Sequence, residues 1–91
     1  MAYGTIMEFD AELDTHVKII EAMGDDPVDG LIVHAAGTSA AGIRMVDVWE
    51  SKDHYDRFFG ERLMPAMAAL DLPGGPPSSF EELDLPVVLR G

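Results

Sequence analysis

The chain has 91 residues with seventeen carboxylates against six Lys and Arg, a formal charge of −11 and no cysteine. A chain of this length forms one domain with a small core, and without cysteine neither disulfides nor thiolate metal ligands can stabilise it. Its negative surface repels phosphate backbones and anionic lipids, which argues against nucleic acid and membranes as partners. The first residues lack a basic flank and a long apolar run, so we expect no signal peptide and a cytoplasmic protein.

Alternating residue types over residues 2–9 predict a first strand, since successive side chains of a strand point to opposite faces. One face of this strand carries Tyr3, Thr5, Met7 and Phe9. A helix follows, and it is expected to begin after an N-cap at Asp10 or Asp14 and to end before Gly24. The apolar stripe of this helix consists of Leu13, Val17 and Ile20.

Two further strand-like runs, residues 31–36 and 43–49, are apolar on both faces, and the small polar segment 37–42 between them predicts a hairpin loop. An antiparallel sheet with helices on one side normally alternates apolar with polar residues. These runs do not alternate, so both faces of the sheet must be covered. Because 91 residues are too few for two helical layers, we expect the second cover to be the same sheet of another copy, in a homodimer.

Ser51 is placed to cap a second helix, which Pro65 should kink or break because proline offers no N–H to the preceding turn. The apolar stripe of this helix consists of Tyr55, Phe59, Leu63, Ala66 and Leu70. Residues 72–79 are rich in Pro, Gly and Ser and predict a loop. A last strand is expected over residues 80–90, where Pro86 requires an edge position or a bulge.

The resulting order, β-α-β-β-α-β, predicts an α+β fold of the ferredoxin-like type in a single domain spanning residues 1–91. In this fold a four-stranded antiparallel sheet carries both helices on one face. Two such sheets facing each other in the homodimer would form a dimeric α/β barrel.

Four segments also carry a family resemblance: Gly30-Leu31-Ile32-Val33-His34, Gly42-x-Arg44-x-Val46-Asp47-Val48-Trp49-Glu50-Ser51, Phe58-Phe59 and Leu63-x-Pro65-Ala66. Together they resemble the dimeric α/β-barrel superfamily, and most closely its small bacterial members related to the antibiotic-biosynthesis monooxygenases. The resemblance implies a dimer with a ligand pocket in each subunit between sheet and helices. It also implies an activity among those of the superfamily, which include cofactor-free oxygenation, isomerisation, dehydration and haem degradation.

The haem-degrading branch fits poorly. Its members use an Asn on the first strand, a Trp near the end of the third and an iron-binding His on the second helix. Trp49 suits the second of these positions, but the first strand has no Asn and the helix carries Phe58 where the histidine should fall. No histidine pair has metal-binding spacing either, so we expect neither a metal nor a cofactor.

His34 is the first candidate for chemistry, because it is a single titratable group in an apolar strand. Burial would favour its neutral form, which suits a general base. The alternative is a structural histidine bonded to Asp47, Tyr55 or a backbone carbonyl. Trp49, with Phe58, would line an aromatic ligand pocket, or else fill the core or the dimer interface.

Three further residues are candidates for ligand binding. His16 lies within the apolar arc of the first helix, where it faces a cavity or lies at the margin and reaches water. Arg44 and Asp47 lie on opposite faces of the third strand, and each needs a partner if it is buried. Arg44 could hold a substrate carboxylate or pair with a carboxylate across the dimer.

Two functions are consistent with these features. The first is a small-molecule-binding homodimer that acts as a cofactor-independent monooxygenase or isomerase on an aromatic or polyketide-like substrate. In it His34 is the catalytic base, and the ligand site comprises His16, Arg44, Asp47, Trp49 and Phe58. The second is a non-catalytic dimeric ligand-binding or accessory protein. On sequence alone both stand, and whether the protein is an enzyme stays open.

Overall fold

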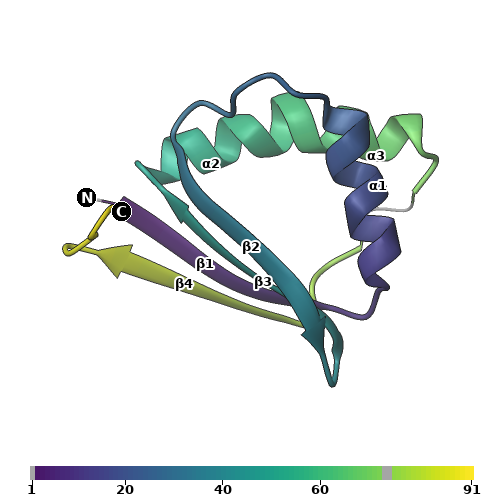
Figure 1. Cartoon of the computed structure of the whole chain (residues 1–91), viewed down its shortest axis with the longest axis horizontal. Helices are drawn as coiled ribbons and strands as arrows, with labels where there is room; N and C mark the ends of the chain where they lie inside the picture. Colours follow the sequence, from purple (N-terminus) through teal and green to yellow (C-terminus); the bar gives the residue numbers. More distant parts are fainter. Residues whose placement is uncertain (1, 73–74) are drawn as a thin grey trace.

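All the helices lie on one side of a single antiparallel sheet (Figure 1). The structure is a computed structural model that describes residues 2–72 and 75–91. Its elements in chain order are β1 (Ala2–Phe9), α1 (Leu13–Met23), β2 (Leu31–Ser39), β3 (Gly42–Trp49), α2 (Lys52–Phe58), the π-helical turn η1 (Phe59–Leu63), α3 (Met64–Ala69) and β4 (Ser79–Leu85). The strand order is β2-β3-β1-β4, which is the ferredoxin-like arrangement expected from the sequence.

The register of the two central strands determines which side chains the helices cover. In the antiparallel pair of β1 and β3, Tyr3 lies opposite Trp49 and Thr5 lies opposite Asp47. All four side chains are buried, as are Met7, Ile43 and Met45. The core of the molecule therefore lies on this face of β1 and β3, which we call the helix-covered face.

We call the other side of the sheet the open face; near its centre lie Ile6, Val33, Val46 and Val48. No helix of the described chain covers it (Figure 1), and Val33 and Val46 remain 46% and 41% exposed. The C-terminal residues return toward this side of the end of β3, where Arg90 forms a 2.6 Å ion pair with Glu50. The sheet is thus apolar on a face that its own helices leave bare.

Several local expectations need correction. The loop expected at 37–42 is only the two-residue turn Ala40–Ala41, because β2 continues to Ser39 and pairs there with Gly42. The residue at the N-cap of α1 is Glu12, without a side-chain hydrogen bond, instead of Asp10 or Asp14. The stripe of Leu13, Val17 and Ile20 is 36–44% exposed, because α1 turns its neighbouring face toward the sheet.

The C-terminal strand is shorter than expected. β4 ends at Leu85, directly before Pro86, and it is an edge strand, which agrees with the edge position that proline requires. In the loop predicted over residues 72–79, Pro73 and Gly74 lie outside the described residues, residues 75–78 have no regular structure, and Ser79 already belongs to β4. Among the described residues no helix is long and apolar enough to cross a membrane.

Pro65 changes the hydrogen-bond spacing of the second helix instead of breaking it. Just before the proline, the N–H of Met64 bonds to the carbonyl of Phe59, five residues earlier, which is the spacing of a π-helix. α3 then continues directly after this turn, with Pro65 in its first turn. Ser51 caps the start of α2 as expected, since its hydroxyl accepts from the N–H of His54.

A tight contact between Gly30 and His54 joins the start of β2 to α2. Gly30 has φ +80°, and a Cβ there would lie 2.2 Å from the ring of His54. The ring itself is held by a 2.7 Å hydrogen bond between its Nδ1 and the Ser51 hydroxyl. Both the backbone conformation and the available space therefore require glycine.

We expect Gly30→Ala to lower the free energy of unfolding by at least about 1–3 kcal/mol, because alanine strains the left-handed backbone and also meets the His54 ring. Urea unfolding followed by circular dichroism measures this change. Gly37→Ala in β2 is the matched control, since no atom lies within 4 Å of its added Cβ. Equal effects of the two substitutions would contradict the assignment.

Candidate functional site

A buried carboxylate and a histidine form the centre of the site. His34 of β2 and Asp47 of β3 are partners in the strand register, so their side chains lie on the same, helix-covered face. Asp47 is buried, and its Oδ1 accepts a hydrogen bond from Nδ1 of His34. A carboxylate in the interior is strongly unfavourable unless it is paired and hydrogen-bonded. His34 supplies that pairing.

A second histidine reaches the first from the helical layer. His16 of α1 places its Nε2 2.9 Å from Nε2 of His34, with the ring centroids 5.1 Å apart. Both ring nitrogens of His34 are therefore engaged, while Nδ1 of His16 has no hydrogen-bond partner in the described part of the chain. We call His16, His34 and Asp47 the triad.

The two histidines titrate in opposite directions from their ordinary pKa of 6.5. The hydrogen bond to the Asp47 carboxylate raises the pKa of His34, although partial burial opposes this shift. Burial lowers the pKa of His16, and the positive charge that His34 can carry lowers it further. A single proton shared by the pair therefore resides on His34, next to the carboxylate.

Aromatic side chains pack beside the triad and attach α2 to the sheet. The Trp49 ring lies 5.1 Å from that of Phe58 and 5.9 Å from that of Tyr55, and Tyr3 lies 5.6 Å from Tyr55. Burial, followed by the negative charge of Asp47, raises the pKa of Tyr55. The triad thus has a packed aromatic cluster beside it, and the raised pKa of Tyr55 keeps its hydroxyl protonated at neutral pH.

Three buried polar atoms of this region lack a hydrogen-bond partner among residues 2–72 and 75–91: Tyr3 Oη, Thr5 Oγ1 and Trp49 Nε1. Thr5 is the register partner of Asp47, and Tyr3 is that of Trp49. Each such group costs about 1–3 kcal/mol when buried without a partner. Burial raises the pKa of Tyr3 to about 12, with a smaller contribution from Glu82, so its hydroxyl is available as a donor.

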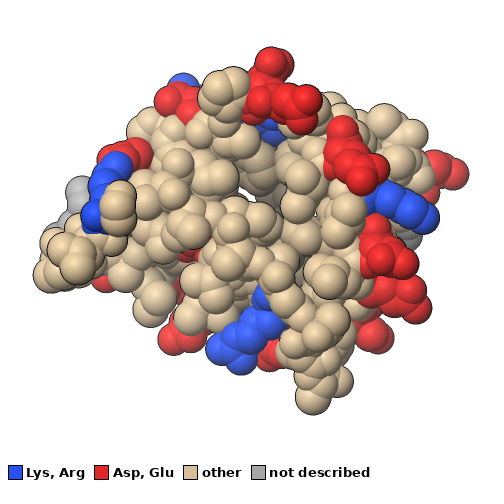
Figure 2. Space-filling view, viewed as in Figure 1, with Lys and Arg blue, Asp and Glu red and all other residues tan. Residues whose placement is uncertain are grey.

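The helices and the sheet do not close tightly on each other. No residue of α1 is fully buried, and Figure 2 shows a narrow opening between the helical layer and the sheet, bordered by uncharged surface. The acidic groups lie mostly toward the rim of this view. The two histidines meet across the space between α1 and the sheet, so the triad spans the two layers of the molecule.

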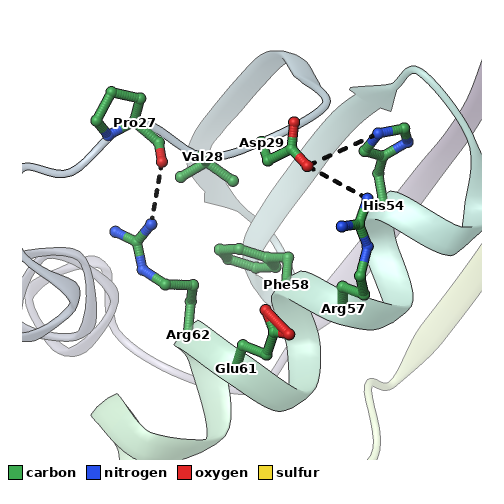
Figure 3. Close-up of a pocket in the computed structure, with 8 residues that line it drawn as sticks. All are labelled: Pro27, Val28, Asp29, His54, Arg57, Phe58, Glu61 and Arg62. Atoms are coloured by element: carbon green, nitrogen blue, oxygen red, sulfur yellow. Dashed lines mark hydrogen bonds and ion pairs between the residues drawn. The ribbon is translucent and has the colours of Figure 1, made fainter.

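Two surface cavities lie away from the triad. The smaller, about 120 Å³, is lined by residues of the loop before β2 and of α2 and η1 (Figure 3). There Asp29 faces His54 and Arg57, and Arg62 donates to the carbonyls of Met23, Asp26 and Pro27. These bonds hold the loop between α1 and β2. The larger is a groove of about 550 Å³ beside the open face, formed mainly by Leu31, Ile32, Val33, Val48, Val88 and Leu89.

The structure brings together some of the expected site residues and separates others. His16, His34 and Asp47 form the triad, and Trp49 packs close by against Phe58, which also lines the smaller surface cavity. Arg44 lies on the open face, exposed, 4.0 Å from the carboxylate of Glu8. It is therefore not part of the group around the triad. Within the described residues, no three His, Asp or Glu side chains are arranged to hold a metal ion.

Sequence reasoning missed Tyr3 and Thr5 as members of this region. The alternation of the first strand places Tyr3 and Thr5 on one face together with Met7. This alternation does not determine the strand register that places Thr5 opposite Asp47. Tyr55 was expected either in the apolar stripe of its helix or as a hydrogen-bond partner of His34, and the structure gives His34 the partners Asp47 and His16 instead.

Solved structures share this fold at low sequence identity. No protein-family model matches the chain, and no curated protein matches its sequence. A candidate antibiotic biosynthesis monooxygenase from Chloroflexus aurantiacus J-10-fl superposes with a TM-score of 0.72 at 18% identity, over 100% of this chain and 98% of that chain. The Rv0793 protein of Mycobacterium tuberculosis gives 0.67 at 17% identity, over 100% of both chains.

A monooxygenase from the gene ActVA-Orf6 of Streptomyces coelicolor, solved in complex with the ligand nanaomycin D, gives a TM-score of 0.51 at 22% identity, over 99% of this chain and 91% of that chain. These likenesses confirm the fold that the resemblance implied. The chain shares the subunit fold of these solved structures.

The pKa shifts of the triad predict how each histidine titrates. NMR of the ring C2 protons should show His34 titrating above pH 6.5 and His16 below it, and Asp47→Asn should remove the upward shift. Because folding raises the pKa of His34, its pairing with Asp47 contributes stability that is fully present below pH 6.5 and is lost as pH rises through the raised pKa. A midpoint for His34 at or below 6.5 in the unmodified protein would contradict this assignment.

Proposed function

We propose that the protein is a small-molecule-binding homodimer that acts as a cofactor-independent monooxygenase or isomerase on an aromatic or polyketide-like substrate. One observation carries this proposal, namely the buried Asp47 that orients His34, with His16 bonded to its far side. A histidine oriented by a buried carboxylate is suited to moving protons. The aromatic cluster beside the triad offers the kind of surface on which a planar apolar ligand stacks.

The proposed chemistry needs no bound metal or flavin. A substrate such as an aromatic ketone with an acidic C–H loses that proton to a histidine, and the resulting carbanion gives up its electrons directly to oxygen. For anthrone, C14H10O and O2 give anthraquinone, C14H8O2, and water. The protein contributes orientation, exclusion of water and proton removal, and a positioned base accounts for about 10²–10⁴-fold of the rate.

The solved structures support the proposal as analogies of fold. One of them is a candidate antibiotic biosynthesis monooxygenase and another is a monooxygenase in complex with nanaomycin D. Since one fold hosts many activities, the functional argument rests on the triad, and the shared fold is consistent with the proposed activity.

A second candidate function, ligand binding without turnover, is favoured by the groove beside the open face. Its volume of about 550 Å³ lies within the range of small-molecule sites, and among the described side chains that line it Arg90 alone is charged. A ligand held there would meet apolar side chains and no group able to act as a general base. The two candidate functions therefore place the ligand at different sites, and because Val33 and Val48 line the groove and also belong to the open face, a ligand bound in the groove would lie at the edge of the dimer interface.

The homodimer is supported by the apolar open face. Val33, Val46 and Val48 lie side by side on neighbouring strands, and their own helices lie on the opposite side of the sheet. Burying such a surface against a second copy removes apolar area from water at about 25 cal/mol per Å². A two-fold arrangement presents the same patch from both subunits, so every contact there occurs twice.

Val46→Glu tests the dimer. Each subunit would then contribute one unpaired carboxylate to the interface. We expect this to raise the dimer dissociation constant by more than about a hundredfold. Sedimentation velocity measures the change. Val17→Glu on α1 is the matched control, since Val17 is 44% exposed and Val46 is 41% exposed. A Val46→Glu variant that stays dimeric, or a native protein that is monomeric at micromolar concentration, would refute the proposed assembly.

Anthrone and nanaomycin D test the ligand site and the reaction. We expect both to raise the thermal unfolding temperature, and anthrone to be oxidised with uptake of one O2 per molecule in an oxygen electrode. Replacing His16 and His34 together by alanine should lower kcat/KM by about 10²–10⁴, whereas the control His54→Gln should not. Binding without oxygen uptake, with NMR shifts at Val33 and Val48 instead of the histidines, would favour the second function.

A further inference from the structure

The hydrogen bonds of the triad leave only one ring nitrogen free. Nδ1 of His34 is bonded to Asp47 and Nε2 of His34 is bonded to Nε2 of His16. A substrate can therefore reach His34 only by displacing one of its partners. Nδ1 of His16, across the ring from the bonded Nε2, has no partner in the described part of the chain.

The carboxylate determines where the protons of both neutral rings lie. Asp47 in its charged form only accepts, so the proton of neutral His34 is on Nδ1. Nε2 of His34 then carries a lone pair, and Nε2 of His16 must donate to it. The remaining lone pair, on Nδ1 of His16, is basic and unoccupied.

We propose, on the basis of the function proposed above, that His16 is the catalytic base and that His34 and Asp47 are positioning residues which fix its tautomer. In this proposal the base is His16 in place of His34, the base predicted from the sequence. The geometry gives His34 the role of the middle member of a relay, with no contact to the substrate.

The proton transfer is balanced. The substrate C–H or O–H bond breaks, its electron pair stays on the substrate anion, and the proton bonds to Nδ1 of His16. The proton on Nε2 of His16 moves to Nε2 of His34, which becomes an imidazolium between His16 and the carboxylate of Asp47. Reversal of the two transfers returns a proton to an isomerised or oxygenated product.

The surroundings of His16 indicate the class of substrate. Leu13 and Ile20 lie three residues before and four residues after His16, so they border it on the helix surface. Both are apolar and remain 36% and 40% exposed. The substrate is therefore an apolar molecule that covers these side chains and presents an acidic C–H or O–H group to the ring.

Nitrogen NMR of the histidine rings tests the order of the relay without any substrate. At a pH where both rings are neutral, we expect His34 to carry its proton on Nδ1 and His16 on Nε2, with a scalar coupling between the two Nε2 atoms. The chain has three histidines, so His54 serves as the internal reference. A proton on Nε2 of His34, or no coupling between the rings, would overturn the proposal.

Deuterium exchange into the central CH2 of anthrone under argon isolates proton removal from the reaction with oxygen. We expect His16→Ala to slow exchange by about 10²–10⁴-fold. His34→Gln should slow it by only about tenfold, because the glutamine carbonyl can still accept from Nε2 of His16. His54→Gln is the control, and thermal unfolding checks that each variant is folded.

The outcomes of the exchange experiment separate the alternatives. Loss of exchange in His34→Gln equal to that in His16→Ala, or retained exchange in His16→Ala, would overturn the assignment of the base. If the unmodified protein exchanges no deuterium, the proposed function fails for this probe. The ring spectra alone then decide whether the triad has the stated order.

Discussion

The buried carboxylate of Asp47 is the interaction around which the rest of the molecule is organised. A charge on a central strand is tolerated only if a donor lies opposite, and the register of β2 against β3 places His34 there. His34 in turn presents its second nitrogen toward the helices, where His16 of α1 meets it. One electrostatic requirement thereby joins three elements that are separate in the sequence, and it holds a polar path inside an otherwise apolar layer.

Most of the fold could be predicted from the sequence, because it depends on local patterns. Alternation indicated β1, continuous apolar runs indicated β2 and β3, and Ser51 indicated the start of α2. The apolar residues on both faces of β2 and β3 indicated a sheet whose helices cover only one face. Boundaries were less predictable. The turn at Ala40–Ala41 and the end of β4 before Pro86 depend on pairing with neighbouring strands, which local composition does not determine.

The sequence indicated which residues form the triad. It did not indicate which of their side chains contact each other. His16, His34 and Asp47 each stood out as polar groups in apolar surroundings, and Asp47 was already one possible partner of His34. The contact between the histidines depends on how α1 is rotated about its axis. The apolar stripe of Leu13, Val17 and Ile20 was expected to face the sheet, but it is exposed, so the rotation of α1 differs from the one that this stripe predicts. Tyr3 and Thr5 join the site only through the register of β1 with β3.

The π-helical turn before Pro65 has a consequence for how this helix tolerates changes of length. Such a turn holds one more residue than an α-helical turn, so it takes up an added position without rotating the helix that follows. Removing one residue between Phe59 and Leu63 would leave an ordinary α-helical turn, whereas removing one residue from the regular part of α3 would rotate everything after it by about 100° about the helix axis. Ala66, the only buried residue of α3, keeps its place against the core in the first case. The irregular turn therefore preserves the phase of α3, and through it the side that α3 presents to α1.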